Sequence, residues 1–96
     1  IRIGEGKEYY NDGKLKFEGI YINGKRLRKG KKYNNNGELE FEGIIFFNKK
    51  KEGKEYYDNG KLKFVGEYLN NEIWNGKVYN KDGLIDFEIK NGNYFK

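Results

Sequence analysis

The stretch KEYYNDGKLKFEGIYINGK, residues 7–25, returns almost unchanged as KEYYDNGKLKFVGEYLNNE at residues 54–72. Looser copies of the same pattern lie between these two stretches and after them. A chain that repeats one short pattern at a fixed period builds the same supersecondary unit several times. The fold of this protein is therefore decided by what one copy of the pattern forms.

Glycine and aromatic residues keep the register of the repeat. The Gly-Lys dipeptide begins at Gly6, Gly30, Gly53 and Gly76, with spacings of 24, 23 and 23 residues. The other recurring positions are Gly13, Gly37, Gly60 and Gly83; Gly19, Gly43 and Gly66; Tyr9, Tyr33, Tyr56 and Tyr79; and Phe17, Phe41, Phe64 and Phe87. This register predicts four units, at approximately residues 6–29, 30–52, 53–75 and 76–96, within a single domain spanning residues 1–96.

Each unit has the pattern of a β-hairpin. Leu15, Phe17, Gly19 and Tyr21 alternate with Lys16, Glu18 and Ile20, as expected of a strand with one apolar face. The turn sequences NDG, NNNG, DNG and KDG precede these strands, and a second turn follows each of them, at Asn48-Lys49 in the second unit. We therefore predict an all-β protein, a single-layer, elongated antiparallel β-meander of about four hairpin repeats of 23–24 residues.

The ring-bearing face of this sheet is the first candidate surface. We expect the mid-strand glycine, as at Gly43, to make room for a ring of the adjacent strand. A single-layer sheet with one apolar face normally acquires a second layer, which a partner protein, a second copy or a helix outside these residues could supply. The candidate protein-binding residues are Phe17, Tyr21, Phe41, Phe64, Tyr68 and Phe87.

The composition excludes most catalytic chemistry. The 96 residues include no Cys, His, Met or Pro and no Ser, Thr, Ala or Gln, so the usual nucleophiles, the imidazole base and the soft metal ligands are missing. Glu38, Glu40 and Glu42 share one strand face, but equivalent positions such as Lys16 and Lys63 carry the opposite charge. We interpret these carboxylates as members of a lattice of complementary surface charges. We therefore predict that the protein is not an enzyme and needs no cofactor, metal ion or small-molecule substrate.

Cysteine usage and hydropathy bear on location. Without cysteine the fold needs no disulfide, which favours a cytoplasmic setting. The longest uncharged apolar run, residues 44–47, is too short to span a bilayer. Because the chain begins at Ile1 rather than at methionine, we expect it to be part of a longer protein.

The motifs of the repeat resemble those of a known family. FEGIYINGKRLRKGKKYNNNG, residues 17–37, and FVGEYLNNEIWNGKVYNKDG, residues 64–83, resemble MORN repeats, which combine an aromatic-x-Gly-x-aromatic strand, an Asn-Gly turn and a Gly-Lys-x-Tyr strand. The YYxNGKLK portion is also similar to the bacterial MORN-variant group described as antitoxin-like. The resemblance extends from Gly6 to Gly92, with Asn71 in place of the turn glycine in the third unit. It implies a scaffold in cytoskeletal or membrane-associated assemblies, with phospholipid contact in some cases.

Basic residues form the second candidate surface. The net charge is +5, and two dense basic groups fall at the second turns of the first and second units. These turns should lie about 10 Å apart on one long edge of the sheet, which is twice the strand spacing. Such an edge can hold anionic lipid headgroups. The candidate lipid-binding residues are Lys25, Arg26, Arg28, Lys29, Lys49, Lys50 and Lys51.

Three interpretations of this edge remain open, namely a solvated edge, contact with an anionic membrane surface, and contact with an acidic protein partner. Nucleic acid is not expected, because the rings follow the structural period and the acidic residues of the same sheet repel phosphate. We therefore predict a non-catalytic scaffold for protein–protein interaction or homodimerisation. The alternative is a membrane tether that contacts anionic phospholipid headgroups through the basic edge.

Overall fold

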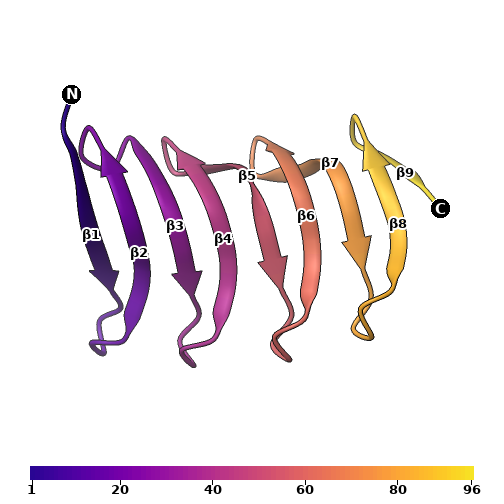
Figure 1. The fold of residues 1–96 in the computed structure, drawn as a ribbon, viewed down its shortest axis with the longest axis horizontal. Coiled ribbons are helices and arrows are strands. Elements are labelled where there is room, and N and C mark those ends of the chain that lie inside the picture. Colours follow the sequence, from indigo (N-terminus) through magenta and orange to yellow (C-terminus); the bar gives the residue numbers. More distant parts are fainter.

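The computed structural model describes residues 1–96 and contains nine β-strands and no helix. The strands are β1 (Ile3–Tyr9), β2 (Leu15–Ile22), β3 (Leu27–Tyr33), β4 (Leu39–Phe46), β5 (Lys49–Tyr56), β6 (Leu62–Leu69), β7 (Glu72–Tyr79), β8 (Ile85–Lys90) and β9 (Asn93–Phe95). They form one open antiparallel sheet in the order of the chain, with overall dimensions of 41 × 30 × 17 Å (Figure 1). The predicted elongated, all-β meander is confirmed. The structure has one further short strand, β9, at the C-terminal end of the sheet.

Four turns of the same type close the hairpins at one end of the strands. In the first, the Gly13 amide donates to the Tyr10 carbonyl oxygen at 2.9 Å, and the Tyr10 amide donates to the Lys14 carbonyl oxygen at 2.8 Å. Gly13 has a φ of +88°, which glycine adopts without steric cost. Asp12 accepts a hydrogen bond from the Lys14 amide at 3.0 Å. The recurring Asn, Asp and Gly residues therefore determine the geometry of the loop.

A second kind of turn connects the units at the opposite ends of the strands. Two consecutive residues with positive φ form each turn, as type I′ hairpins require. These pairs are Asn23–Gly24, Phe47–Asn48, Asn70–Asn71 and Asn91–Gly92. The predicted turn at Asn48-Lys49 is therefore wrong by one residue. Asparagine tolerates the left-handed conformation better than lysine does, so Asn48 takes the second position and Phe47, with a φ of 49°, takes the first.

A row of glycines crosses the sheet from β1 to β7. Its members lie opposite one another in successive strand pairs and are Gly6, Gly19, Gly30, Gly43, Gly53, Gly66 and Gly76. In β8 the corresponding residue is Ile89, which pairs with Gly76. The row has no side chains, so the strands can bend along it.

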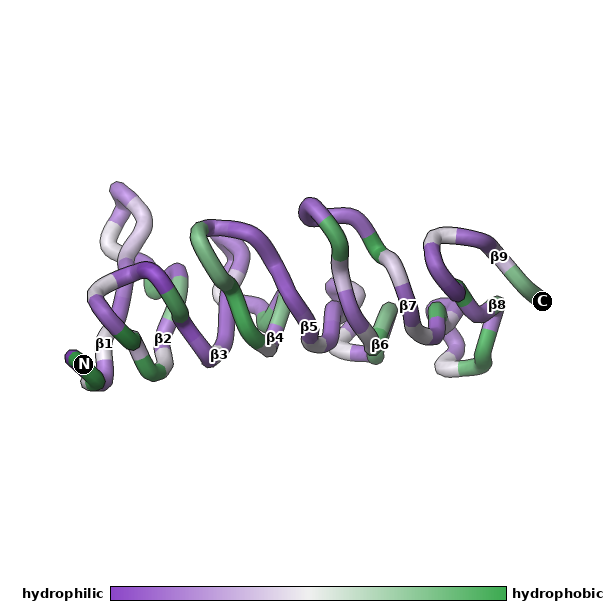
Figure 2. The backbone as a smooth tube through the Cα atoms, turned by 90° about the horizontal axis from the view of Figure 1, so that it is seen from above, coloured by the Kyte–Doolittle hydropathy of each residue, from purple (hydrophilic) through white to green (hydrophobic).

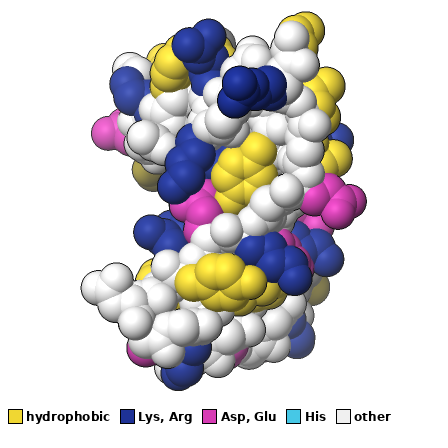
Figure 3. Space-filling model, turned by 90° about the vertical axis from the view of Figure 1, so that its left-hand side faces the viewer, with side chains coloured by type: hydrophobic (Ala, Val, Ile, Leu, Met, Phe, Trp, Pro, Cys, Tyr) yellow, Lys and Arg dark blue, Asp and Glu magenta, His cyan; other side chains and the backbone are white.

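The strands bend at the glycine row so that the ring-bearing face is concave. Residues four apart on an extended strand are roughly 13 Å apart, yet the ring centroids of Phe64 and Tyr68 are 5.4 Å apart and those of Phe17 and Tyr21 are 5.9 Å apart. Seen from above, the backbone rises and falls instead of lying in a plane (Figure 2). Viewed from the β1 edge, the molecule has a crescent outline with a hollow on one side (Figure 3).

The rings lie over a different set of glycines from the one predicted. A Cβ atom on Gly43 would overlap the Glu52 carbonyl oxygen and lie 2.6 Å from the Cα of Gly53, so this glycine permits two backbones to approach. The Phe41 ring instead lies over Gly53, where a Cβ would be 2.9 Å from a ring carbon. The predicted role of Gly43 is therefore wrong, because a backbone and not a ring fills the space beside it.

Candidate functional site

Most of the predicted protein-binding rings are the core of the chain itself. Phe41 and Phe64 are 0% exposed, Phe17 is 2% exposed and Tyr68 is 5% exposed. Tyr21 and Phe87, the other two candidates, are partly buried. For the four buried rings, the expectation of an uncovered apolar surface is therefore wrong. The bent sheet packs these rings against one another and against Ile45.

Basic side chains cover the rings on the concave face. The Lys50 ammonium lies 5.0 Å from the centroid of the Phe41 ring and 5.7 Å from that of Tyr68. The Arg28 guanidinium lies 5.3 Å from the centroid of Phe17. A cation over an aromatic face is attracted by the quadrupole of the ring. The second layer that a flat sheet would need is thus supplied in part by the chain's own lysine and arginine side chains.

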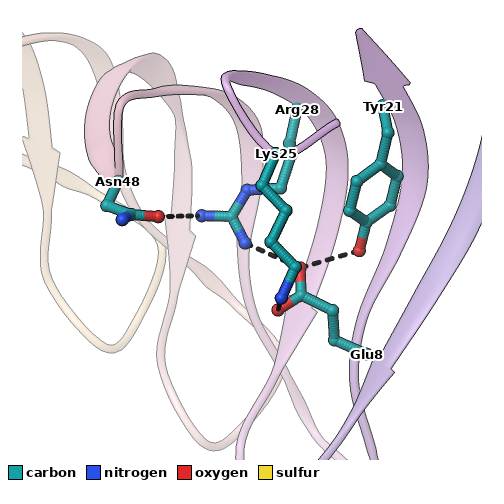
Figure 4. Close-up of polar contacts among 5 residues, drawn as sticks. All are labelled: Glu8, Tyr21, Lys25, Arg28 and Asn48. Atoms are coloured by element: carbon teal, nitrogen blue, oxygen red, sulfur yellow. Dashed lines mark hydrogen bonds and ion pairs between the residues drawn. The ribbon is translucent and has the colours of Figure 1, made fainter. Parts of the chain in front are cut away.

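One carboxylate joins the cations of the N-terminal half. Tyr21 Oη and Arg28 Nη1 each donate to Glu8 Oε2 at 2.7 Å, and Lys25 Nζ lies 3.4 Å from Glu8 Oε1 (Figure 4). Arg28 Nη2 donates to Asn48 Oδ1 at 3.0 Å. Burial by itself would raise the pKa of Glu8, but the hydrogen bonds from Tyr21 and Arg28 and the charges of Arg28 and Lys25 outweigh it and lower the pKa. Glu8 therefore holds β1, β2 and β3 together as an ionised group.

The third unit repeats the tyrosine part of this arrangement. Tyr68 Oη donates to Glu55 Oε2 at 2.6 Å, as Tyr21 does to Glu8. Burial, followed by the hydrogen bond and the charge of the carboxylate, raises the pKa of each of these tyrosines. Both hydroxyl groups therefore remain protonated donors at neutral pH.

A basic hollow of about 490 Å³ opens on the concave face. Five of its ten lining residues are cationic and only one is anionic. The lining residues are Glu8, Lys16, Phe17, Lys25, Arg28, Lys32, Ile45, Asn48, Lys50 and Asn71. We call this cavity the basic hollow.

Only three of the seven predicted lipid-binding residues lie in the basic hollow. Lys25, Arg28 and Lys50 line the basic hollow, whereas Arg26, Lys29, Lys49 and Lys51 do not. The reason is strand alternation, which turns neighbouring residues such as Arg28 and Lys29 to opposite faces. Sequence reasoning missed Lys16 and Lys32 in the lining. For Lys32 the signal was available, since Lys32 and Arg28 are four residues apart on one strand and share a face.

An aromatic pair is exposed at the turn between β4 and β5. Phe46 is 39% exposed and Phe47 is 57% exposed, and their ring centroids are 4.4 Å apart. The Arg26 guanidinium lies 5.5 Å from the centroid of the Phe47 ring. Phe47 occupies a left-handed backbone position that Asn fills in all three of the other second turns. A bulky residue with positive φ is strained, and such strain is concentrated at functional positions.

Substitution of the central carboxylate should destabilise the fold. We expect Glu8→Gln to lower the free energy of unfolding by about 2 kcal/mol at pH 7, because Arg28 is left with an uncompensated charge at a site where its side chain is 11% exposed. The folded pKa of Glu8 lies below its ordinary value of 4.5. Its contribution is therefore fully present above pH 4.5 and is lost as the pH falls through the folded pKa.

Urea denaturation of the two proteins between pH 3 and pH 7 measures this effect. The curves of the wild type and Glu8→Gln should converge as the pH falls. The control is Glu40→Gln, since Glu40 pairs with Lys32 at 3.5 Å on the surface and should cost less than about 0.5 kcal/mol. Equal losses of stability in the two variants would show that the contacts of Glu8 contribute no more to the free energy of unfolding than a surface ion pair does.

The structure offers no group of three or more Asp or Glu side chains that could hold a metal ion. None of its segments is a helix long and apolar enough to cross a membrane. Comparison of the chain with protein-family models, with curated proteins and with solved structures found no match.

Proposed function

We propose that the protein is a non-catalytic, MORN-like interaction scaffold that binds an acidic segment of a partner protein in the basic hollow. The observation that carries this proposal is the charge of the hollow, which has five cationic side chains and one carboxylate in its lining. The proposal places the scaffold in the cytoplasm, in association with a membrane or the cytoskeleton, as the resemblance to MORN repeats implies.

The charges of the basic hollow are only partly compensated within the chain. Glu8 serves both Lys25 and Arg28, and Lys32 has Glu40 at 3.5 Å on the surface. Lys16 and Lys50 have no carboxylate oxygen within 4.0 Å, and their ammonium groups lie over aromatic rings instead. Carboxylates of a partner would therefore gain charge-assisted hydrogen bonds from donors that the chain itself leaves free.

The lining also argues for a peptide rather than a small molecule. Pockets for small molecules are lined mostly by apolar side chains, whereas only Phe17 and Ile45 are apolar among the ten residues of the hollow. Glutamate and aspartate side chains on an extended segment match a wide, polar and positively charged surface. Electrostatic complementarity of this kind gives a partner specificity and fast association.

The affinity of a fluorescein-labelled hexaglutamate peptide, measured by anisotropy, tests the proposal. We expect the double variant Lys16→Glu/Lys32→Glu to weaken binding on the order of 30-fold, since two surface contacts worth about 1 kcal/mol each become repulsive. Wild-type affinity should fall as salt rises, because partly exposed charges are screened. The matched control is Lys14→Glu/Lys61→Glu, which changes the net charge equally at exposed lysines outside the hollow. Equal weakening by both double variants would reject the hollow as the site.

A membrane tether is the second candidate, and Phe47 is the observation that favours it. The exposed rings of Phe46 and Phe47 lie at a turn that Arg26 and Lys49 flank. Aromatic rings beside basic residues suit the interface of an anionic bilayer, where each cation contributes about 1 kcal/mol. In that case the protein would contact the membrane through this turn, and not through all seven residues of the predicted basic edge.

Replacement of Phe47 by asparagine separates stability from membrane binding. We expect Phe47→Asn to raise the free energy of unfolding by about 1 kcal/mol, because asparagine adopts a φ of 49° with less strain. Asn70 stands in the same position with a φ of 53°. If the turn inserts into bilayers, the same variant should lose retention by phosphatidylserine liposomes. Unchanged retention, or no liposome binding by the wild type, would remove the membrane candidate.

A further inference from the structure

The outer face of the sheet, opposite the rings, carries a ladder of alternating charges beside the glycine row. Its residues follow a buried phenylalanine or lie directly opposite a residue that does, so strand alternation turns them away from the concave face. In the first five strands the ladder consists of Lys7, Glu18, Lys31, Glu42 and Lys54, each directly opposite the next. Opposite charges in directly opposite cross-strand pairs stabilise an antiparallel sheet.

Tyrosine hydroxyl groups bind the carboxylates of this ladder. Tyr33 Oη of β3 donates to Glu18 Oε1 at 2.8 Å, and Tyr56 Oη of β5 donates to Glu42 Oε1 at 3.0 Å. Tyr79 holds the corresponding position of β7. In the first two units each ladder carboxylate therefore lies between two lysines and accepts a hydrogen bond from a tyrosine.

The third unit exchanges the acidic and the apolar residue of this pattern. The first two units read Phe-Glu-Gly-Ile at residues 17–20 and 41–44, whereas the third reads Phe-Val-Gly-Glu at residues 64–67. Val65 therefore takes the ladder position on β6, and the carboxylate of Glu67 lies on the other side of the glycine row.

The exchange leaves an apolar residue between two cations. Val65 lies directly opposite Lys54 of β5 on one side and Lys77 of β7 on the other, as the order of these strands in Figure 1 allows. The far sides of the two lysines face Glu42 and Glu88, but neither lysine forms an ion pair. The ladder is therefore short of one negative charge at Val65.

Tyr79 lacks the acceptor that the other tyrosines have. Val65 has no oxygen atom to take the place of the carboxylates that bind Tyr33 and Tyr56. A carboxylate placed above Val65 by another molecule would meet a tyrosine hydroxyl group and two lysines, the same kinds of donor that surround Glu18.

Two carboxylates meet on the other side of the glycine row. Glu52 and Glu67 lie directly opposite each other, and like charges in such a pair destabilise a sheet. Glu67 accepts a hydrogen bond from Asn75 Nδ2 at 3.4 Å, and neither carboxylate forms an ion pair. Together with Lys54 and Val65 they line a hollow of about 350 Å³ over the glycine row. A local arrangement that opposes stability is expected where a sequence serves binding.

We propose that the outer face of β5, β6 and β7 binds a protein partner that presents an acidic and a basic side chain next to each other, the acid above Val65 and the base above Glu52 and Glu67. Residues two apart on an extended segment are roughly 7 Å apart on one face, as Val65 and Glu67 are, so a Glu-x-Lys segment has the matching spacing. This inference goes beyond the proposed function, because it gives the scaffold a second partner on the face opposite the basic hollow.

Backbone amide shifts of the full chain during titration with the peptide acetyl-Gly-Glu-Gly-Lys-Gly-amide test the proposal. We expect saturable shifts at Lys54, Val65, Glu67 and Lys77. Peptides in which both charged residues are Glu, or both are Lys, should bind about tenfold more weakly, because one of their charges then meets like charges. Absence of saturable shifts at these residues in millimolar peptide, or equal affinity for the three peptides, would overturn the proposal.

Two charge-neutral double variants show whether the exchanged residues are responsible. Val65→Glu/Glu67→Ile restores the pattern of the first two units, and we expect it to lose the saturable shifts and to melt at a higher temperature than the wild type. The control Glu18→Val/Ile20→Glu makes the reverse exchange in the first unit. It should keep the shifts at Lys54 and Lys77 and melt at a lower temperature, because the bond from Tyr33 is lost.

Undiminished peptide binding by Val65→Glu/Glu67→Ile would contradict the proposed site, and a lower melting temperature of this variant would contradict the premise that the exchange opposes stability. Hexaglutamate binding by the same variant should equal that of the wild type, since the basic hollow is unchanged. Loss of Glu-x-Lys binding with intact hexaglutamate binding therefore separates the outer face from the proposed function, and loss of both would show that the two surfaces are not independent.

Discussion

Gly43→Val should lower the free energy of unfolding by about 3 kcal/mol, at the upper end of what overpacking costs. The first atom of the new side chain would overlap the Glu52 carbonyl oxygen and lie 2.6 Å from the Cα of Gly53. Both obstacles are backbone atoms of β5, which cannot rotate away as a side chain can. Relief requires the strands to separate at the bend, and that also loosens the rings packed on the concave face. Urea denaturation followed by circular dichroism measures the loss.

Gly24→Asn is the control for this substitution. Gly24 has a φ of +71° and open space beside it, and Asn48 and Asn71 occupy the same turn position with φ of 64° and 68°. The change should therefore cost less than about 0.5 kcal/mol, as substitutions away from special features do. Similar denaturation midpoints for Gly43→Val and Gly24→Asn would contradict the close glycine pairs on which the bend depends.

Phe64→Ala should cost 3–5 kcal/mol, as removal of a buried phenylalanine typically does (an order-of-magnitude value). Phe64 is fully buried and contacts Tyr68 edge to face, with the ring centroids 5.4 Å apart. A small domain has only about 5–15 kcal/mol of stability in total. We therefore expect Phe64→Ala to be largely unfolded under conditions in which the wild type is folded. Thermal and chemical denaturation of the two proteins measure this difference.

The matched substitution is Phe46→Ala, which removes a ring that is 39% exposed. Its cost should stay below about 1 kcal/mol, because a large part of Phe46 is already in contact with water and little further apolar area is exposed by its removal. The sequence predicted that Phe64 binds a partner, whereas its burial indicates a role in the core. A Phe64→Ala protein that stays fully folded but no longer associates with a partner would support the binding role.

The architecture was predictable because its signals are local. The period-two alternation of residues 15–21 indicates a strand, and the recurring Asn-Asp-Gly sequences indicate the turns that pair it with its neighbours. Curvature carries no such local signal. Alternation shows that Phe17 and Tyr21 share a face, but only the bend at Gly19 shows that their rings meet.

The near-identity of the first and third units has a structural meaning that the sequence alone did not disclose. Tyr10 Oη donates to the Tyr33 carbonyl oxygen at 2.7 Å, and Tyr57 Oη donates to the Tyr79 carbonyl oxygen at 2.7 Å. In the second and fourth units the position of these tyrosines is occupied by asparagine. Alternate units are therefore tied to the unit that follows them, and these tyrosine-to-carbonyl contacts recur every two units.

The candidate site was harder to predict than the fold. Residues 25–29 and 49–51 form dense basic runs in sequence, and proximity along the chain suggested one surface. In a strand, however, adjacent residues point to opposite faces, so the runs are divided between the basic hollow and the outer surface. The hollow instead gathers Lys16, Lys32 and Lys50 from separate strands. Such a set becomes visible only when strand register and curvature are both known.

Backbone amide chemical shifts, mapped during titration with hexaglutamate, test directly whether the basic hollow binds an acidic segment. The proposed function predicts saturable shifts concentrated in the basic hollow, at Lys16, Arg28, Lys32 and Lys50, and little change at the exposed lysines Lys14 and Lys61. Shifts spread evenly over all lysines, or confined to the Phe46–Phe47 turn, would contradict the assignment of the concave face as the site where this scaffold binds its partner.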